Sequence, residues 1–149
     1  MDELITLLDE NLICTGMDIS SDFIYFFVTS TRKECVCPSC QSVSSRVHSH
    51  YNRNFQDLPI QDKKVIVTLS NRKKFCDNPS CHQTTFAGNC FIDNKTKKTK
   101  RLKETIMEVS LTQSYVSAAV YLTKHLVDVK KSTICNYQKK CIGNKYRED

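Results

Sequence analysis

Two close cysteine pairs constrain this chain more than any other feature of its sequence. The first is CPSC, residues 37 to 40, and the second is CDNPSC, residues 76 to 81, with 35 residues between them. Cysteine pairs at such separated points serve either as disulfide staples or as four thiolates that bind one metal ion. The redox compartment of the chain decides between these two uses.

The N-terminal sequence favours a reducing compartment. MDELITLLDENLI begins with acids where a signal peptide would carry Lys or Arg, and it has no continuous apolar core. The longest apolar patch, FIYFFV at residues 23 to 28, is too short to span a bilayer. We therefore expect a cytoplasmic chain without membrane partners. In such a chain nine cysteines, an odd number, favour a metal over disulfides.

The spacing of the pairs is typical of a zinc ribbon, in which a β-hairpin separates two cysteine turns. Residues 46–59 and 63–75 both have strand-like sequences, and QD at residues 61 and 62 is expected to form the turn between them. Four cysteines complete a tetrahedral shell, which indicates a structural ion and not a catalytic one. We predict one Zn²⁺ bound by Cys37, Cys40, Cys76 and Cys81. Two unligated thiol pairs are the alternative, and Cys35 and His82 remain open as substitute ligands.

The regions on either side of the cysteines predict further elements. Residues 3–13 carry leucines and an isoleucine at near-helical spacing, which predicts an amphipathic helix, and residues 22–30 read as a strand. Three helices are predicted after residue 101, with Ser114 as the cap of the second and Ser132 or Thr133 as the cap of the third. The second helix should pack through a stripe of Ala118, Tyr121, Leu122, His125 and Leu126.

A three-helix unit with a short last connector fits the helix-turn-helix plan, in which the final helix enters the major groove of DNA. Ile134, Tyr137 or Gln138, and Cys141 are expected to face inward. The residues left to contact DNA are Thr133, Asn136, Lys139 and Lys140. Asn can read adenine, and Lys serves guanine or phosphate. A plain helical bundle is the alternative.

The distribution of charge also indicates an anionic partner. Residues 1–34 carry seven acids against two bases, whereas residues 35–149 carry 20 bases against nine acids. KTKKTKRLK, residues 95–103, has six positive charges and no acid, so it can follow a phosphate backbone. Its candidate contacts are Lys97, Lys98, Lys100 and Arg101. A solvated linker and surface are the alternative.

We therefore predict an α+β chain in which a small antiparallel zinc ribbon precedes a three-helix helix-turn-helix unit. The predicted parts are an N-terminal helix and strand, the zinc ribbon, a basic linker, the helix-turn-helix domain and a tail. They span residues 1–34, 35–92, 93–100, 101–142 and 143–149.

The quoted motifs resemble the zinc-binding head of insertion-sequence transposases of the ISL-three group. The shared order is CPSC, then VHSHYNR, DLP and a basic strand, then CDNPSC and TF, over residues 35–92 and more loosely to residue 142. The resemblance implies the same four zinc ligands and a basic face of Arg53, Arg72, Lys73 and Lys74. It also implies a bacterial, nucleoid-associated protein that binds duplex DNA at the terminal repeats of a mobile element, and a homodimer is compatible with paired repeats.

In that family a DDE catalytic domain follows, and this sequence stops at GNKYRED. We therefore expect that the chain does not cut or join DNA. The open alternatives are an expression fragment, a truncated transposase remnant, a stand-alone transcriptional regulator, or a zinc ribbon that binds protein. An RNA-binding ribbon is a further alternative, in which Tyr51 and Phe55 would stack on bases.

Overall fold

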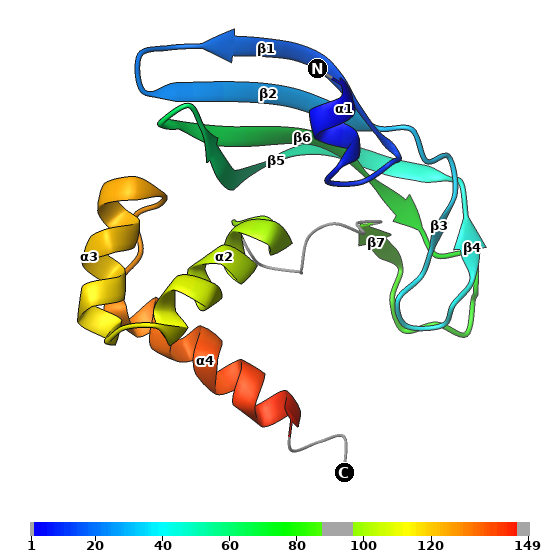
Figure 1. The fold of residues 1–149 in the computed structure, drawn as a ribbon. Coiled ribbons are helices and arrows are strands. Elements are labelled where there is room, and N and C mark those ends of the chain that lie inside the picture. Colours follow the sequence, from blue (N-terminus) through cyan, green and yellow to red (C-terminus); the bar gives the residue numbers. More distant parts are fainter. Residues whose placement is uncertain (1, 88–96, 146–149) are drawn as a thin grey trace.

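A computed structural model of the protein describes residues 2–87 and 97–145 (Figure 1). The N-terminal half contains one short helix and seven strands: α1 (Asp2–Thr6), β1 (Leu12–Ile19), β2 (Phe23–Ser30), β3 (Cys35–Val36), β4 (Val43–Ser44), β5 (Val47–Ile60), β6 (Lys63–Phe75) and β7 (Thr85–Ala87). Three helices follow: α2 (Lys100–Leu111), α3 (Tyr115–His125) and α4 (Lys131–Lys145). The described residues are thus α+β, and they contain no helix long and apolar enough to cross a membrane.

The main sheet has the strand order β1-β2-β6-β5, and β7 pairs with the distal part of β6. β5 and β6 form the predicted antiparallel hairpin, in which Gln61 and Asp62 make the turn with positive φ angles of 48° and 62°. β2 runs parallel to β6. The chain leaves this sheet after Ser30 and rejoins it at Val47. The predicted parts 1–34 and 35–92 therefore both contribute strands to the same sheet.

The core of the sheet follows the alternation of its strands. Val65, Val67 and Leu69 are buried on one face of β6. Neighbouring strands bury further apolar side chains in the same cluster: Ile24, Phe26, Val28 and Phe55. Ile5 of α1 and Leu12 complete it, and Figure 1 shows α1 lying against these strands.

The predicted helix over residues 3–13 is wrong beyond Thr6. The backbone N–H and the side-chain amide of Asn11 both donate to Asp9 Oδ1, at 2.8 and 3.0 Å. Such local bonds of Asp and Asn compete with helical hydrogen bonds and favour a turn. After this turn Leu12 begins β1, a strand that we did not predict, and the strand predicted for residues 22–30 is confirmed as β2.

The three predicted helices are present and share a second core. Ser114 caps α3 as predicted, since its hydroxyl accepts a hydrogen bond from the Ser117 N–H. The buried cluster consists of Leu102, Ile106, Ala118, Leu122, Val127, Val129 and Ile134. The helices therefore form a packed unit with its own apolar interior.

Two details of the helical prediction are wrong. Tyr121 and His125 lie on the exposed side of α3 with ring centroids 4.6 Å apart, while Val127 and Val129 of the connector fill the core in their place. α4 begins at Lys131, and the Lys130 carbonyl accepts bonds from the N–H groups of Thr133 and Ile134. Ser132 and Thr133 thus lie within the first turn and do not cap it.

Candidate metal centre

Two tight turns present the cysteine pairs to each other. Cys37 and Cys40 lie between β3 and β4, where the Cys37 carbonyl accepts a bond from Gln41 N and Gln41 has a positive φ of 65°. Cys76 and Cys81 lie between β6 and β7, where the Asn78 carbonyl accepts from Cys81 N at 3.1 Å. The β5–β6 hairpin returns the second pair to the first, as a zinc ribbon requires.

The four predicted cysteines converge on one point. Their sulfur atoms all lie within 4.8 Å of one another. The Sγ–Sγ distance is 4.0 Å between Cys37 and Cys81, and it is 3.4 Å between Cys40 and Cys76. Zinc bound to four thiolates at about 2.3 Å places sulfurs about 3.8 Å apart, so the cluster has the dimensions of a tetrahedral zinc site.

The chemistry of the thiols also fits a cation. Hydrogen bonds from the side chain and backbone of Ser42 lower the pKa of Cys40 to about 6. A bond from the Asn78 backbone acts to lower the pKa of Cys76, but burial and the neighbouring sulfurs outweigh it and raise this pKa to about 12. Sulfurs this close therefore do not all ionise by themselves, and a bound divalent ion would stabilise the four thiolates and release their protons. Bound zinc would supply cross-linking between the two turns.

The two residues that the sequence leaves open as replacement zinc ligands lie outside the cluster. Neither Cys35 nor His82 belongs to the group of converging sulfurs, and His82 is exposed. One neighbour that we did not predict is Gln83, whose Oε1 accepts from Ser39 Oγ at 2.7 Å and lies 3.9 Å from Cys37 Sγ. No sequence signal identifies Gln83, because the contact joins residues 44 positions apart.

The basic face implied by the resemblance is divided between the two sides of β6. Lys73 is exposed, with its Nζ 5.8 Å from the Tyr51 ring centroid, and the Arg53 guanidinium lies 4.9 Å from the Phe55 ring centroid. Arg72 is half-buried and Lys74 is only 2% exposed. Lys74 therefore does not belong to an exposed face.

The basic linker is not wholly available to contact phosphate, because part of it is bound to β5. Arg101 is committed to an ion pair with Asp57, and Lys98 forms a parallel bridge with Gln56 of β5. Lys97 and Lys100 are exposed. Residues 93–96 of the predicted linker and 146–149 of the tail lie outside the described residues, as does the side chain of Cys141.

The predicted DNA-reading residues lie together on α4. Asn136, Lys139 and Lys140 are exposed, and Thr133 is half-buried. On the other side of this helix Ile134 is buried, and Gln138 Nε2 donates to Ser110 Oγ at 3.0 Å. The structure thus gives α4 one anchored side and one polar side.

Residues 33–82 match the family model described as the zinc-finger of transposase IS204/IS1001/IS1096/IS1165. The matched region contains all four converging cysteines and ends before the three helices. No curated protein and no solved structure matches the chain. The chain therefore carries a zinc-ribbon domain of this transposase type over about a third of its length.

Proposed function

We propose that this protein binds duplex DNA in a zinc-dependent manner, as the DNA-recognition part of a transposase. Its target would be the terminal inverted repeats of a mobile element. The observation that carries the proposal is a transposase-type zinc ribbon at residues 33–82, joined in one chain to a helix whose exposed side is polar and basic. A DNA-binding regulator adopted from a transposase would use the same parts at a promoter.

In this proposal α3 and α4 act as a helix-turn-helix, with α4 as the recognition helix. Ile134 fixes α4 against the other helices, and Asn136, Lys139 and Lys140 face away from that core. The first turn of α4 contains no acid, so the partial positive charge of its N-terminus is available to phosphate. The exposed Lys130 and Lys131 add charge at the same end.

The role of zinc is to hold the ribbon and not to catalyse a reaction. Four cysteines leave no position for water or substrate, and the ion would be bound only by side chains of the two turns. We propose accordingly that this chain recognises DNA without cutting it. Failure of strand transfer with magnesium or manganese on its preferred DNA would agree with this proposal.

The first test is selection of bound sequences from a random duplex DNA library, with one arm containing zinc and the other a strong chelator. We expect an enriched motif in the zinc arm that is lost on chelation. Enrichment of a sequence found at the ends of a mobile element favours the transposase role, and a promoter motif favours the regulator. Weak, salt-sensitive retention without enrichment in either arm would contradict sequence recognition.

The second test addresses α4 directly. Asn136→Ala should weaken binding to the selected motif by about 1–3 kcal/mol and relax the preference at one base pair, because a bidentate Asn–adenine contact is lost. Lys139→Gln should weaken binding to all sequences and reduce the salt dependence by about one contact. Asn52→Ala, at an exposed position of β5, is the matched control and should change neither quantity. Equal effects of Asn136→Ala and Asn52→Ala on binding would contradict the proposal that α4 contacts the bases.

The RNA-binding alternative loses one of its two stacking platforms. Phe55 is 1% exposed within the sheet core, so no base can stack on its ring. Tyr51 accepts a hydrogen bond from Asn71 Nδ2 at 2.9 Å and lies beneath Lys73. Single-stranded RNA should therefore compete poorly with the selected duplex.

A further inference from the structure

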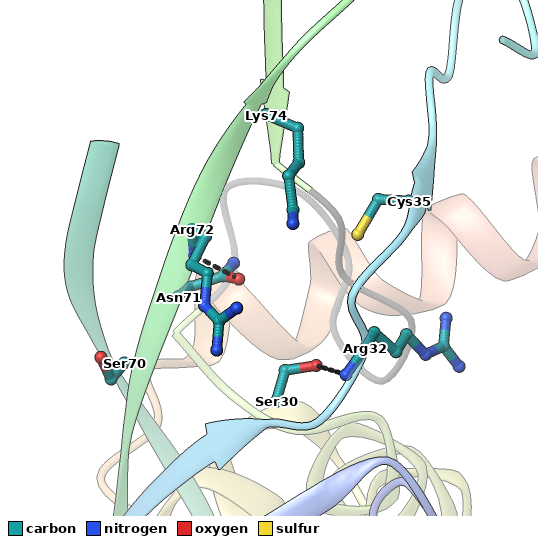
Figure 2. A pocket seen from close by; sticks show the side chains of 7 residues that line it. All are labelled: Ser30, Arg32, Cys35, Ser70, Asn71, Arg72 and Lys74. Atoms are coloured by element: carbon teal, nitrogen blue, oxygen red, sulfur yellow. Dashed lines mark hydrogen bonds between the residues drawn. The ribbon is translucent and has the colours of Figure 1, made fainter. Parts of the chain in front are cut away.

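A small pocket opens where the parallel pairing of β2 and β6 ends. Thr29 and Ser70 are the last paired residues of the two strands, and β7 joins the same edge of β6 only at Lys73. The chain from Arg32 to Cys35 passes over this gap on its way to the first cysteine turn (Figure 2). The pocket is lined by Ser30, Arg32, Cys35, Ser70, Asn71, Arg72 and Lys74.

The pocket is strongly basic. Ser70, Arg72 and Lys74 alternate along β6, so their side chains project from the same face of the strand. Figure 2 shows the guanidinium of Arg72, the ammonium of Lys74 and the thiol of Cys35 directed into the pocket, whereas the guanidinium of Arg32 points away from it. No carboxylate is among the described residues that line it.

Lys74 is the most unusual member of this pocket. Its side chain is 2% exposed, and its Nζ donates to the Lys33 carbonyl at 2.8 Å. No carboxylate in residues 2–87 or 97–145 lies within ion-pair distance of this ammonium. A buried charge is stable only when it is paired or well hydrogen-bonded, and an ammonium has three donors. The buried Lys74 ammonium is therefore suited to bind an anion.

The dimensions select the kind of anion. The enclosed space holds about one oxygen-sized atom, which excludes a nucleobase. One oxygen of a tetrahedral phosphate can enter while the remaining oxygens stay at the mouth, within reach of the flexible Arg72 side chain. Arg and Lys are the usual protein donors to phosphate oxygens.

We propose that this pocket binds a single backbone phosphate of the DNA, with Lys74 and Arg72 as its two cationic donors. The inference rests on the proposed DNA-binding function and adds to it a fixed phosphate contact beside the zinc ribbon. It also separates Arg72 and Lys74 from Lys73, which projects from the opposite face of β6 over Tyr51. Phosphodiester and free inorganic phosphate share the chemistry that the pocket recognises.

The test compares Arg72→Gln, Arg72→Lys and Lys74→Met with Lys73→Gln in the full, zinc-loaded chain. In the first arm, binding to the selected duplex is measured against salt concentration. Arg72→Gln should reduce the slope of log K against log salt by about 0.9, the value for one phosphate contact, and Arg72→Lys should retain most of it. In the second arm, inorganic phosphate should raise the melting temperature of the wild type and of Lys73→Gln, and it should raise that of Arg72→Gln less.

The outcomes distinguish failure of the pocket proposal from failure of the proposed DNA-binding function. If the wild type binds duplex DNA but Arg72→Gln leaves both the salt slope and the phosphate effect unchanged, the pocket proposal is overturned and the proposed function stands. If the wild type binds no duplex and phosphate still stabilises it through Arg72, the site takes free phosphate and the proposed function fails. Arg72 is half-buried at the pocket, so its variant keeps the test valid even if Lys74→Met does not fold.

Discussion

Cys76→Ser is expected to abolish zinc binding and to unfold the ribbon between β3 and β7. Structural zinc contributes on the order of 10 kcal/mol to the folding of small modules. That contribution is comparable with the entire stability of an ordinary domain, about 5–15 kcal/mol. The apolar clusters lie in the main sheet and among the helices, and of the four cysteines Cys37 alone is buried. Apart from polar contacts such as the Ser39–Gln83 hydrogen bond, little else therefore holds the two cysteine turns together.

Two measurements check this result. Elemental analysis should find one zinc per wild-type chain and none bound to Cys76→Ser. Cobalt added to the wild type should produce the absorption of a tetrahedral four-thiolate site. Cys35→Ser is the matched control, because this cysteine lies two residues from Cys37 but outside the converging sulfurs. Retention of one tightly bound zinc by Cys76→Ser, or its loss from Cys35→Ser, would contradict the assigned ligands.

The cysteine cluster could be predicted from sequence because its determinants are local. A turn such as CPSC orients two thiols through a few neighbouring residues, and the hairpin that joins the turns is encoded by the alternation of Val65, Val67 and Leu69. The cap at Ser114 was predictable for the same reason, since its hydroxyl bonds to an amide three residues away. Local patterns carry this information in the order of the residues themselves.

The rest of the structure depends on contacts between distant residues. Nothing in FIYFFV shows that β2 pairs parallel with a strand about 40 residues later, and this pairing creates the pocket in Figure 2. Lys74 reads as one member of a basic run, yet it is buried, and its ammonium donates to the Lys33 carbonyl of the crossing segment. Such crossings are selected by the packing of the whole chain, so charge patterns in the sequence do not reveal them.

Asp57→Ala is expected to lower the free energy of unfolding by about 3 kcal/mol and to loosen the helices from the sheet. Asp57 is 3% exposed near the end of β5. Its Oδ1 accepts from Thr99 Oγ1 at 2.8 Å and from Arg101 Nε at 2.7 Å, while its Oδ2 pairs with Arg101 Nη2. Because the Arg101 side chain is 32% exposed, water reduces the loss, and we take the lower end of the range for buried pairs.

The matched control for this substitution is Asp128→Asn. Asp128 pairs with Lys64 at 3.2 Å, but its side chain is 73% exposed, so the loss should be below about 1 kcal/mol. Denaturant unfolding followed by circular dichroism measures both variants, because the chain has no Trp. Equal losses for the two variants would show that the buried pair has no special role.

The consequence of Asp57→Ala reaches beyond stability. Thr99 caps α2 through its hydroxyl, and its N–H donates to the Gln56 carbonyl, so the start of the helical unit is bonded directly to β5. Without Asp57 the unit keeps its own apolar core and its backbone bonds to β5, but it is held less firmly against the sheet. If both parts contact DNA as proposed, joining them less rigidly should weaken their combined binding, although each contact is unchanged. We therefore expect Asp57→Ala to reduce affinity for the selected duplex while zinc content remains one per chain. Loss of zinc in this variant would instead mean that the ribbon and the helical unit fold as one.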